Sequence, residues 1–194
     1  MAEVKVLVEG YAKKLGKGWL ASSSAVLIKS GGKLIVCDPG CNRKKLLASL
    51  KKEKISPDDI DFVFLTHGHP DHSLLAGIFE KAECVTFEGL IYRNDRQLEI
   101  GKNVLGLEIK VIATPGHARE HLSLIVETEK GKCAVAGDVF WWIEGEKQNI
   151  DINKIDDAHP DETEMKELKE SRKKLLKLAD CIIPGHGKTF FVKK

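Results

Sequence analysis

Short apolar runs, most of them closed by Gly, Pro, Asp or His, follow one another along the whole chain. The pattern therefore predicts a series of strands separated by sharp turns. The run at 62–65 is continuous, which is typical of a strand that is covered on both faces. We expect these strands at residues 4–8, 25–28, 34–37, 62–65, 84–87, 107–113, 122–126, 133–136 and 181–183.

Three other segments carry apolar residues at the spacing of a helix. One helix is predicted from Asn42, with Leu46 on its apolar face, and a second over about 72–78. The clearest spans 161–179, opens with acidic residues and ends with basic ones, which suits the helix dipole. Its basic end, which includes Arg172, is interpreted as a solvated face. Strands interspersed with helices indicate an α/β layered domain.

Composition narrows the class of protein. The length of 194 residues predicts one domain over 1–194. A hydrophobic fraction of 42%, a charged fraction of 31% and a net charge of +2 are typical of a folded protein. The longest uncharged stretch, 18–28, has 11 residues, whereas a membrane-spanning helix needs about 20, so no membrane partner is expected. Five cysteines without a CxxC pair, and no secretory signal, indicate reduced thiols and a cytoplasmic location.

Histidines and aspartates gather where the apolar runs end. Residues 66–72 hold four of them within six positions, after a predicted strand and before a predicted helix. His67 and His69 point to the same side of an extended backbone, whereas the neighbours Asp71 and His72 cannot easily do so. The group therefore divides naturally between two metal ions, and imidazole and carboxylate suit Zn, Fe, Mn or Co. The same strand–turn–ligand order recurs at His117, Asp138 and His186.

These motifs resemble those of the metallo-β-lactamase superfamily. The resemblance rests on HxHxDH at 67–72, TPGH ending at His117, GD ending at Asp138 and PGHG around His186, and it covers nearly the whole chain. It implies a four-layered αβ/βα sandwich, made of two mixed sheets flanked by helices, with a dinuclear metal site at one edge.

The resemblance also implies a set of ligands for each of two divalent ions. We expect these ions to be Zn²⁺, with Fe and Mn as alternatives. The first ion would be held by His67, His69 and His117, the second by Asp71, His72 and His186, and Asp138 would bridge them. Two such ions make a shared water nucleophilic and neutralise charge on the substrate, so we expect a hydrolase. Asp38 would orient a ligand histidine or the hydroxide, and Asp71 or Asp38 would relay the proton.

Several residues near these motifs are candidates for substrate contact, each with a structural alternative. Arg119 follows a ligand closely and is a candidate clamp for an anionic substrate. His121 either supports the site or is a structural histidine, and Trp141 and Trp142 either wall the pocket or pack in the core. The basic and aromatic segment 11–19 is either a flap over the site or a solvated hairpin.

Three activities remain open for the substrate. Segments 8–11, 136–140 and 171–174 resemble the metallo-β-lactamase domain-containing protein 1 family, which is associated with cleavage of histone pre-messenger RNA, and this favours an RNA phosphodiesterase or endoribonuclease. The short chain and modest charge favour a glyoxalase II-like (thio)esterase or lactonase for small molecules. A mononuclear-iron sulfur dioxygenase is the third alternative, against which a complete second site argues. The expected partner is thus RNA or a small ester, with a homodimer left open.

Overall fold

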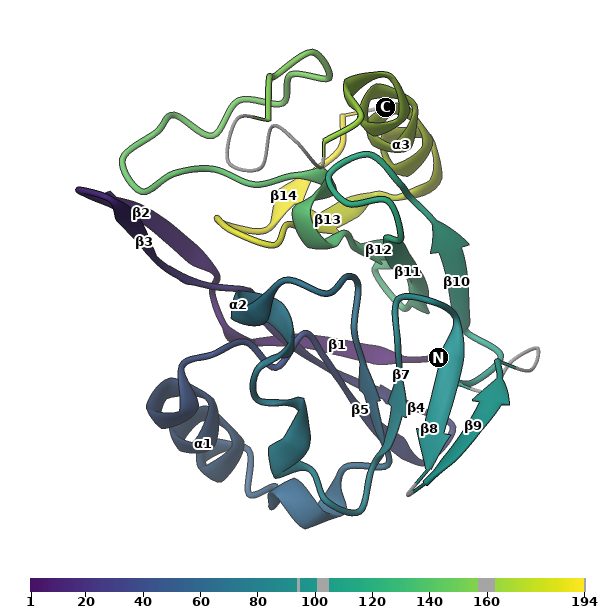
Figure 1. Ribbon diagram of the computed structural model, residues 1–194. Coiled ribbons are helices and arrows are strands. Elements are labelled where there is room, and N and C mark those ends of the chain that lie inside the picture. The colour runs from purple at the N-terminus through teal and green to yellow at the C-terminus, as the bar shows by residue number, and fades with distance from the viewer. Residues whose placement is uncertain (94, 101–104, 157–162, 194) are drawn as a thin grey trace.

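The computed structural model describes residues 1–93, 95–100, 105–156 and 163–193, and two mixed β-sheets form its centre (Figure 1). The first sheet has the order β1-β4-β5-β6-β7-β8-β9 and the second has the order β10-β11-β12-β13-β14. Strands β5, β6 and β7 are parallel to one another, as are β12 and β13, and the other neighbours are antiparallel.

All strands of the first sheet precede those of the second in the sequence. The first sheet comprises β1 (Glu3–Val8), β4 (Ala25–Ser30), β5 (Lys33–Cys37), β6 (Phe62–Phe64), β7 (Glu83–Val85), β8 (Leu90–Arg93) and β9 (Arg96–Glu99). The second comprises β10 (Ile109–Ala113), β11 (Leu122–Thr128), β12 (Gly131–Val135), β13 (Cys181–Ile183) and β14 (Phe190–Phe191). A separate hairpin is formed by β2 (Tyr11–Leu15) and β3 (Gly18–Ser22).

Helices cover the outer face of each sheet. The helices are α1 (Arg43–Lys52), α2 (Pro70–Ser73) and α3 (Met165–Leu178), with 3₁₀ turns at η1 (Pro57–Asp59), η2 (Ala76–Ile78) and η3 (Gly137–Val139). Figure 1 places α1 beside the first sheet and α3 beside the second, so the layers run helix, sheet, sheet, helix. This is the four-layered sandwich that the motif resemblance implied.

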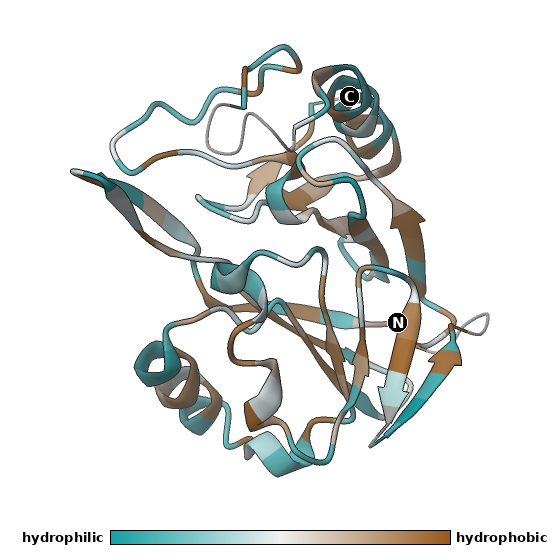
Figure 2. Ribbon diagram, in the orientation of Figure 1, coloured by the Kyte–Doolittle hydropathy of each residue, from teal (hydrophilic) through white to brown (hydrophobic). Residues whose placement is uncertain are grey.

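Alternation along the strands explains the three apolar clusters that hold these layers together. On β4, Ile28 points between the sheets while Leu27 points toward α1. On β11, Val126 points between the sheets while Ile125 points toward α3. Because both faces of these strands are buried, most of their residues are hydrophobic, and Figure 2 shows brown colour along the strands.

The predicted helices are found with changed limits. α1 begins after Asn42, whose side chain accepts a hydrogen bond from the backbone N–H of Lys45, as expected for a helix cap. The helix expected over 72–78 is instead the short α2 followed by the separate turn η2. The third helix was expected to begin at 161 and begins at Met165. Residues 163 and 164 are not helical, and residues 161 and 162 lie outside the described residues.

Each predicted strand is present within a few residues, while five short strands were not predicted. Strands β8, β9, β14 and the hairpin arms carry few buried apolar residues, so no hydrophobic run marks them. The strand expected from 107 begins at Ile109, and Leu107 before it is 83% exposed. Within the described part of the chain, no helix combines the length and apolar character needed to cross a membrane.

The fold brings the ends of strands from both sheets to one edge. The loops that follow β5 and β6 come from the first sheet, and those that follow β10, β12 and β13 come from the second. These five loops carry the histidines and aspartates that the motifs singled out.

Candidate metal centre

A first group of donors lies between the loop after β6 and the second sheet. His67 Nε2 lies 3.0 Å from His69 Nδ1, and His117 Nε2 lies 3.1 Å from the same His69 nitrogen. Asp138 Oδ2 is 3.4 Å from His117 Nε2. One ligand atom of each of these four residues lies within 4.8 Å of the others, so the group could hold a metal ion.

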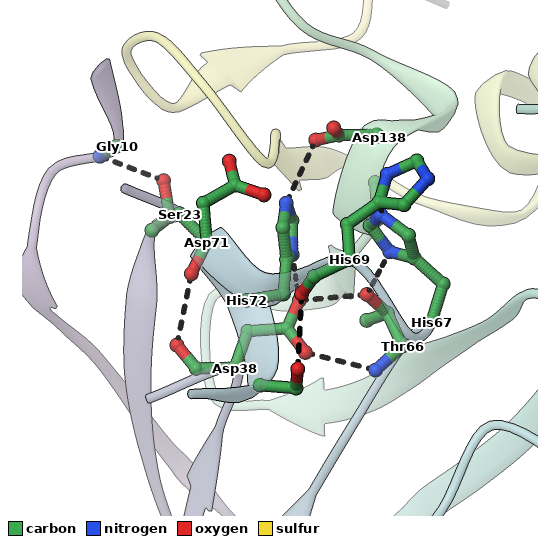
Figure 3. A network of polar contacts seen from close by, with 12 residues as sticks. Gly10, Ser23, Asp38, Thr66, His67, His69, Asp71, His72 and Asp138 are labelled. Carbon is green, nitrogen blue, oxygen red and sulfur yellow. Dashed lines mark hydrogen bonds and ion pairs between the residues drawn. The ribbon is translucent and has the colours of Figure 1, made fainter. Parts of the chain in front are cut away.

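A second group lies beside the first and shares its carboxylate. Asp71 Oδ2 is 3.2 Å from His186 Nε2, and these two residues form a ligand set with His72. Asp138 reaches this set as well, because its Oδ1 is 3.3 Å from His72 Nε2 and its Oδ2 is 3.5 Å from His186 Nε2. The contact between His72 and Asp138 is drawn in Figure 3. All seven side chains expected to bind metal therefore converge, with Asp138 between the two groups.

The distances within these groups fit divalent ions. Nitrogen ligands bind Zn²⁺ at about 2.0–2.1 Å in a tetrahedron, which places neighbouring donors about 3.4 Å apart. His72 Nε2 and Asp138 Oδ1 are buried and lack a hydrogen-bond partner. Buried polar atoms are normally satisfied, and one cation between these atoms would satisfy both. The residues present thus fit the two metal ions that the motifs imply.

The charges of the site also favour a bound cation. Burial lowers the pKa of His67 well below its usual value, so this imidazole is neutral. Burial opposes protonation of His72 too, but the carboxylates of Asp138 and Asp38 raise its pKa well above the usual value. Burial would likewise lower the pKa of His186, yet Asp138 and Asp71 raise it to about 9. The carboxylates thus favour positive charge at this position, which a metal ion supplies.

Asp38 lies beneath the second group and holds His72 in place. Its Oδ1 accepts a hydrogen bond from the backbone N–H of Thr66 at 2.8 Å, and its Oδ2 accepts one from the Thr66 hydroxyl at 2.7 Å. The same Oδ2 lies 2.8 Å from His72 Nδ1, which directs the other ring nitrogen toward Asp138 (Figure 3). Asp38 is 1% exposed, so its position suits orientation of His72 and not contact with substrate.

Asp156 supports the first group in the same way, although no motif in the sequence predicts it. Its Oδ2 lies 2.6 Å from His117 Nδ1, and its side chain is buried. The preceding segment is anchored by Arg172, whose Nε donates to the Val139 carbonyl and whose Nη1 donates to the Ile152 carbonyl. Asp156 stands among other acidic residues, so nothing in the sequence separates it from exposed neighbours. Arg172, expected on a solvated face, is instead 2% exposed.

An open pocket of about 240 Å³ leads to both groups of donors. Asp71 and Asp138 face it, and Trp19 of the β2–β3 hairpin and Trp141 also line it. The two indole rings meet edge to face at 6.2 Å. A second, larger cleft of about 570 Å³ lies near the opposite ends of β12 and β13 and includes none of the seven donors.

The remaining candidates for substrate contact occupy different places. Trp141 lines the pocket, whereas Trp142 packs in the core against Phe140. His121 is buried, stacks on His67 and does not line the pocket, and its Nδ1 contacts the Thr114 hydroxyl. Arg119 is exposed and also lies outside the residues that line the pocket.

Known proteins match this combination of fold and motifs. The model of the metallo-beta-lactamase superfamily matches residues 18–86. The chain is also 34% identical over 200 residues to metallo-beta-lactamase domain-containing protein 1 of Xenopus laevis, an alignment that covers 98% of this chain and 82% of that protein. The chain belongs to the metallo-β-lactamase superfamily. This confirms the superfamily and the family within it that the motifs resembled.

Solved structures of the metallo-β-lactamase superfamily share the fold. A putative metallo-beta-lactamase from Thermotoga maritima superposes with a TM-score of 0.67 at 22% identity, covering 98% of this chain and 99% of that one. AidC, a dizinc quorum-quenching lactonase, superposes with a TM-score of 0.62 at 21% identity, covering 89% and 76%. With these relatives, the chain is a hydrolase enzyme of the metallo-β-lactamase superfamily with a candidate site for divalent metal ions.

Proposed function

We propose that this metallo-β-lactamase superfamily member is a dinuclear hydrolase that cleaves phosphodiester bonds in single-stranded RNA. The observation that carries the dinuclear proposal is the position of Asp138, whose carboxylate lies within 3.5 Å of ring nitrogens from both donor groups. In this proposal His67, His69 and His117 bind one ion, Asp71, His72 and His186 bind the other, and Asp138 bridges them. We expect Zn²⁺, with Fe and Mn as alternatives.

Two bound ions would supply a water of lowered pKa and neutralise charge that develops on the substrate. The chain's own residues prepare the site for this step. Asp38 and Asp156 hold His72 and His117 in fixed orientations, so the ring nitrogens need no rearrangement. Asp71 lines the pocket and its side chain is 27% exposed, so a carboxylate oxygen that does not face His186 can accept the proton of the attacking water.

Aromatic rings and lysines around the pocket support an RNA substrate. Trp19 and Trp141 line the pocket, and Trp19, which is 40% exposed, is the ring that a base can reach. The hairpin adds Lys13 and Lys14, and Lys14 Nζ lies 5.8 Å from the Trp19 ring. Single-stranded nucleic acids bind to such combinations, because bases stack on the rings while cations neutralise phosphates. The resemblance to the family associated with RNA cleavage supports the same substrate.

A small carboxylic ester or lactone is the second candidate, and the pocket volume favours it. About 240 Å³ is below the roughly 300–1,000 Å³ of common ligand pockets, so the space at the metal site suits a compact reacting group. An RNA would place only its scissile phosphate there and lie mostly along the hairpin.

Metal analysis and a substrate panel test both parts of the proposal. Purified protein is loaded with Zn²⁺, Mn²⁺ or Fe²⁺, its metal content is measured, and it is incubated with a labelled single-stranded RNA, a thioester and a lactone. We expect two ions per chain and RNA cleavage, with RNA binding that weakens steeply as salt increases. Cleavage of the lactone or thioester alone would support the small-ester alternative. A single bound iron with oxygen consumption on a persulfide would overturn the hydrolase proposal.

A further inference from the structure

Two cysteines lie side by side at the end of the second sheet that is farther from the metal centre. Cys133 on β12 and Cys181 on β13 are register partners, and their Sγ atoms are 3.6 Å apart. Neighbouring strands lie about 4.8 Å apart, within the 4.4–6.8 Å between Cα atoms that a disulfide spans. The backbone therefore already places both residues where an S–S bond can form with small side-chain movements.

Small molecules can reach this pair through the larger cleft. Both cysteines line the cleft of about 570 Å³, which opens between β1 and the second sheet. Cys133 is 7% exposed, and Cys181 is more open to the cleft. Cys181 is therefore the thiol that a reagent meets first, with Cys133 in contact behind it.

The contact between the thiols also makes their reactivity unequal. The Cys133 thiol donates toward Cys181 Sγ, and this hydrogen bond lowers the pKa of Cys181. The same hydrogen bond, together with burial, raises the pKa of Cys133. Since the thiolate is the nucleophile in disulfide exchange, Cys181 attacks and Cys133 resolves.

We propose that Cys133 and Cys181 form a redox-active dithiol, which low-molecular-weight disulfides such as glutathione disulfide convert to a crosslink between β12 and β13. Deprotonated Cys181 attacks one sulfur of the reagent, breaks its S–S bond and releases one thiolate. Cys133 then gives its proton to that thiolate and attacks Cys181 Sγ, which releases the second thiolate, and this takes up the proton that Cys181 gave to solvent. The protein loses two electrons and two protons, and the reagent becomes two thiols.

The crosslink would join the two strands that lead into the candidate metal centre. Asp138 stands five residues after Cys133, and His186 stands five residues after Cys181. The bond would also close a loop between residues 48 positions apart, which restricts the unfolded chain and stabilises the folded one.

Thiol counting and peptide mapping of the full chain test the proposal. The protein is incubated with glutathione disulfide, quenched with acid, and its free thiols are counted after denaturation. We expect the count to fall from five to three, the mass to fall by about 2 Da, and dithiothreitol to restore both. Trypsin should release the peptides 133–147 and 178–188 as one linked species.

Two serine variants and a melting curve complete the test. Cys181→Ser should abolish the crosslink, whereas the matched control Cys84→Ser, which changes a half-buried cysteine on β7, should leave it unchanged. Oxidised wild-type protein should melt at least about 5 °C higher than reduced protein. Five surviving thiols, a stable glutathione adduct at Cys181, a link to another cysteine or an unchanged melting temperature would each overturn the proposal. The wild-type mapping needs no variant, so it stands even if Cys181→Ser folds poorly.

Discussion

At the scale of single residues, Asp138 lies close to candidate ligands of both donor groups. It approaches His72, His117 and His186, and these imidazoles lower its pKa well below the usual value although burial alone would raise it. The Asp138→Asn variant keeps the shape but removes the charge and one ligand oxygen. We expect metal content to fall from two ions to one or fewer, and kcat/KM to fall by at least about 100-fold.

Metal analysis and steady-state kinetics check this prediction against Glu129→Gln. That control removes an exposed carboxylate after β11 and should change neither quantity. Two tightly bound ions in Asp138→Asn would argue that the carboxylate does not bridge.

Asp156 allows a separate test of ligand orientation. Asp156→Asn weakens the acceptor for His117 Nδ1 without touching the pocket, so we expect metal affinity to fall by about 10–100-fold with a similar circular dichroism spectrum. Competition with a chromogenic chelator measures the affinity. Asp151→Asn, an exposed change in the same segment, is the control. Equal affinities for the wild-type and Asp156→Asn proteins would mean that the contact is structural only.

The motifs and the resemblance predicted the seven donors and Asp38, which orients His72, but not Asp156, which supports His117. His67 and His69 were recognisable because their spacing in an extended backbone places them on one side, after a buried strand. Asp156 acts through the folded position of a long connection, which no local pattern encodes. Arg172 was misjudged for a related reason, since its basic neighbours suggested solvent while its own side chain meets buried carbonyls of the same connection.

At the scale of elements, the start of α3 supports the loop that carries His117. Gly116 has a φ of +131°, and a Cβ there would lie 2.2 Å from the backbone nitrogen of Leu168. Gly116→Ala therefore strains the backbone and pushes the loop away from α3. We expect a loss of about 2–4 kcal/mol in the free energy of unfolding, together with weaker metal binding.

Urea denaturation and metal titration measure both effects of Gly116→Ala. The control is Gly77→Ala in η2, where an added Cβ meets nothing within 4 Å. A Gly116→Ala protein as stable as the control would contradict the tight packing of α3 on this loop.

The hairpin provides a test of the proposed RNA substrate. Replacing Lys13, Lys14 and Lys17 by Gln removes three exposed charges and no residue that lines the pocket. RNA binding should weaken by at least about tenfold at low salt, with a shallower dependence on salt, while hydrolysis of a small neutral ester stays unchanged. Fluorescence anisotropy over a salt series measures the binding. An unchanged salt dependence would place the RNA elsewhere on the molecule.

At the scale of the whole molecule, metal removal should weaken the fold because the ligands come from both sheets. Free metal at about 1,000 times the Kd of a site raises the free energy of unfolding by about 4 kcal/mol. Chelation should therefore lower the melting temperature by about 10 °C. Scanning calorimetry with and without dipicolinate measures this shift. Asp138→Asn should show a smaller shift, and no shift in wild-type protein that has lost its metal would contradict the prediction.

The layered architecture was predictable because both faces of the central strands are covered. Short apolar runs marked β4, β5, β6 and β11, and the motif resemblance then implied how the layers stack. The edge strands β9 and β14 were not predicted, for the opposite reason. β9 is exposed along its whole length, so pairing with β8 and not burial defines it.

The donors of the candidate metal centre come from both sheets, so bound ions would connect the two halves of the chain. The segment up to β9 carries His67, His69, Asp71 and His72, and the segment from β10 carries the other three. Neither half alone offers a complete first or second ligand set. A protein cut between the sheets would therefore regain its ions only when both fragments reassemble, so metal uptake would report their recombination.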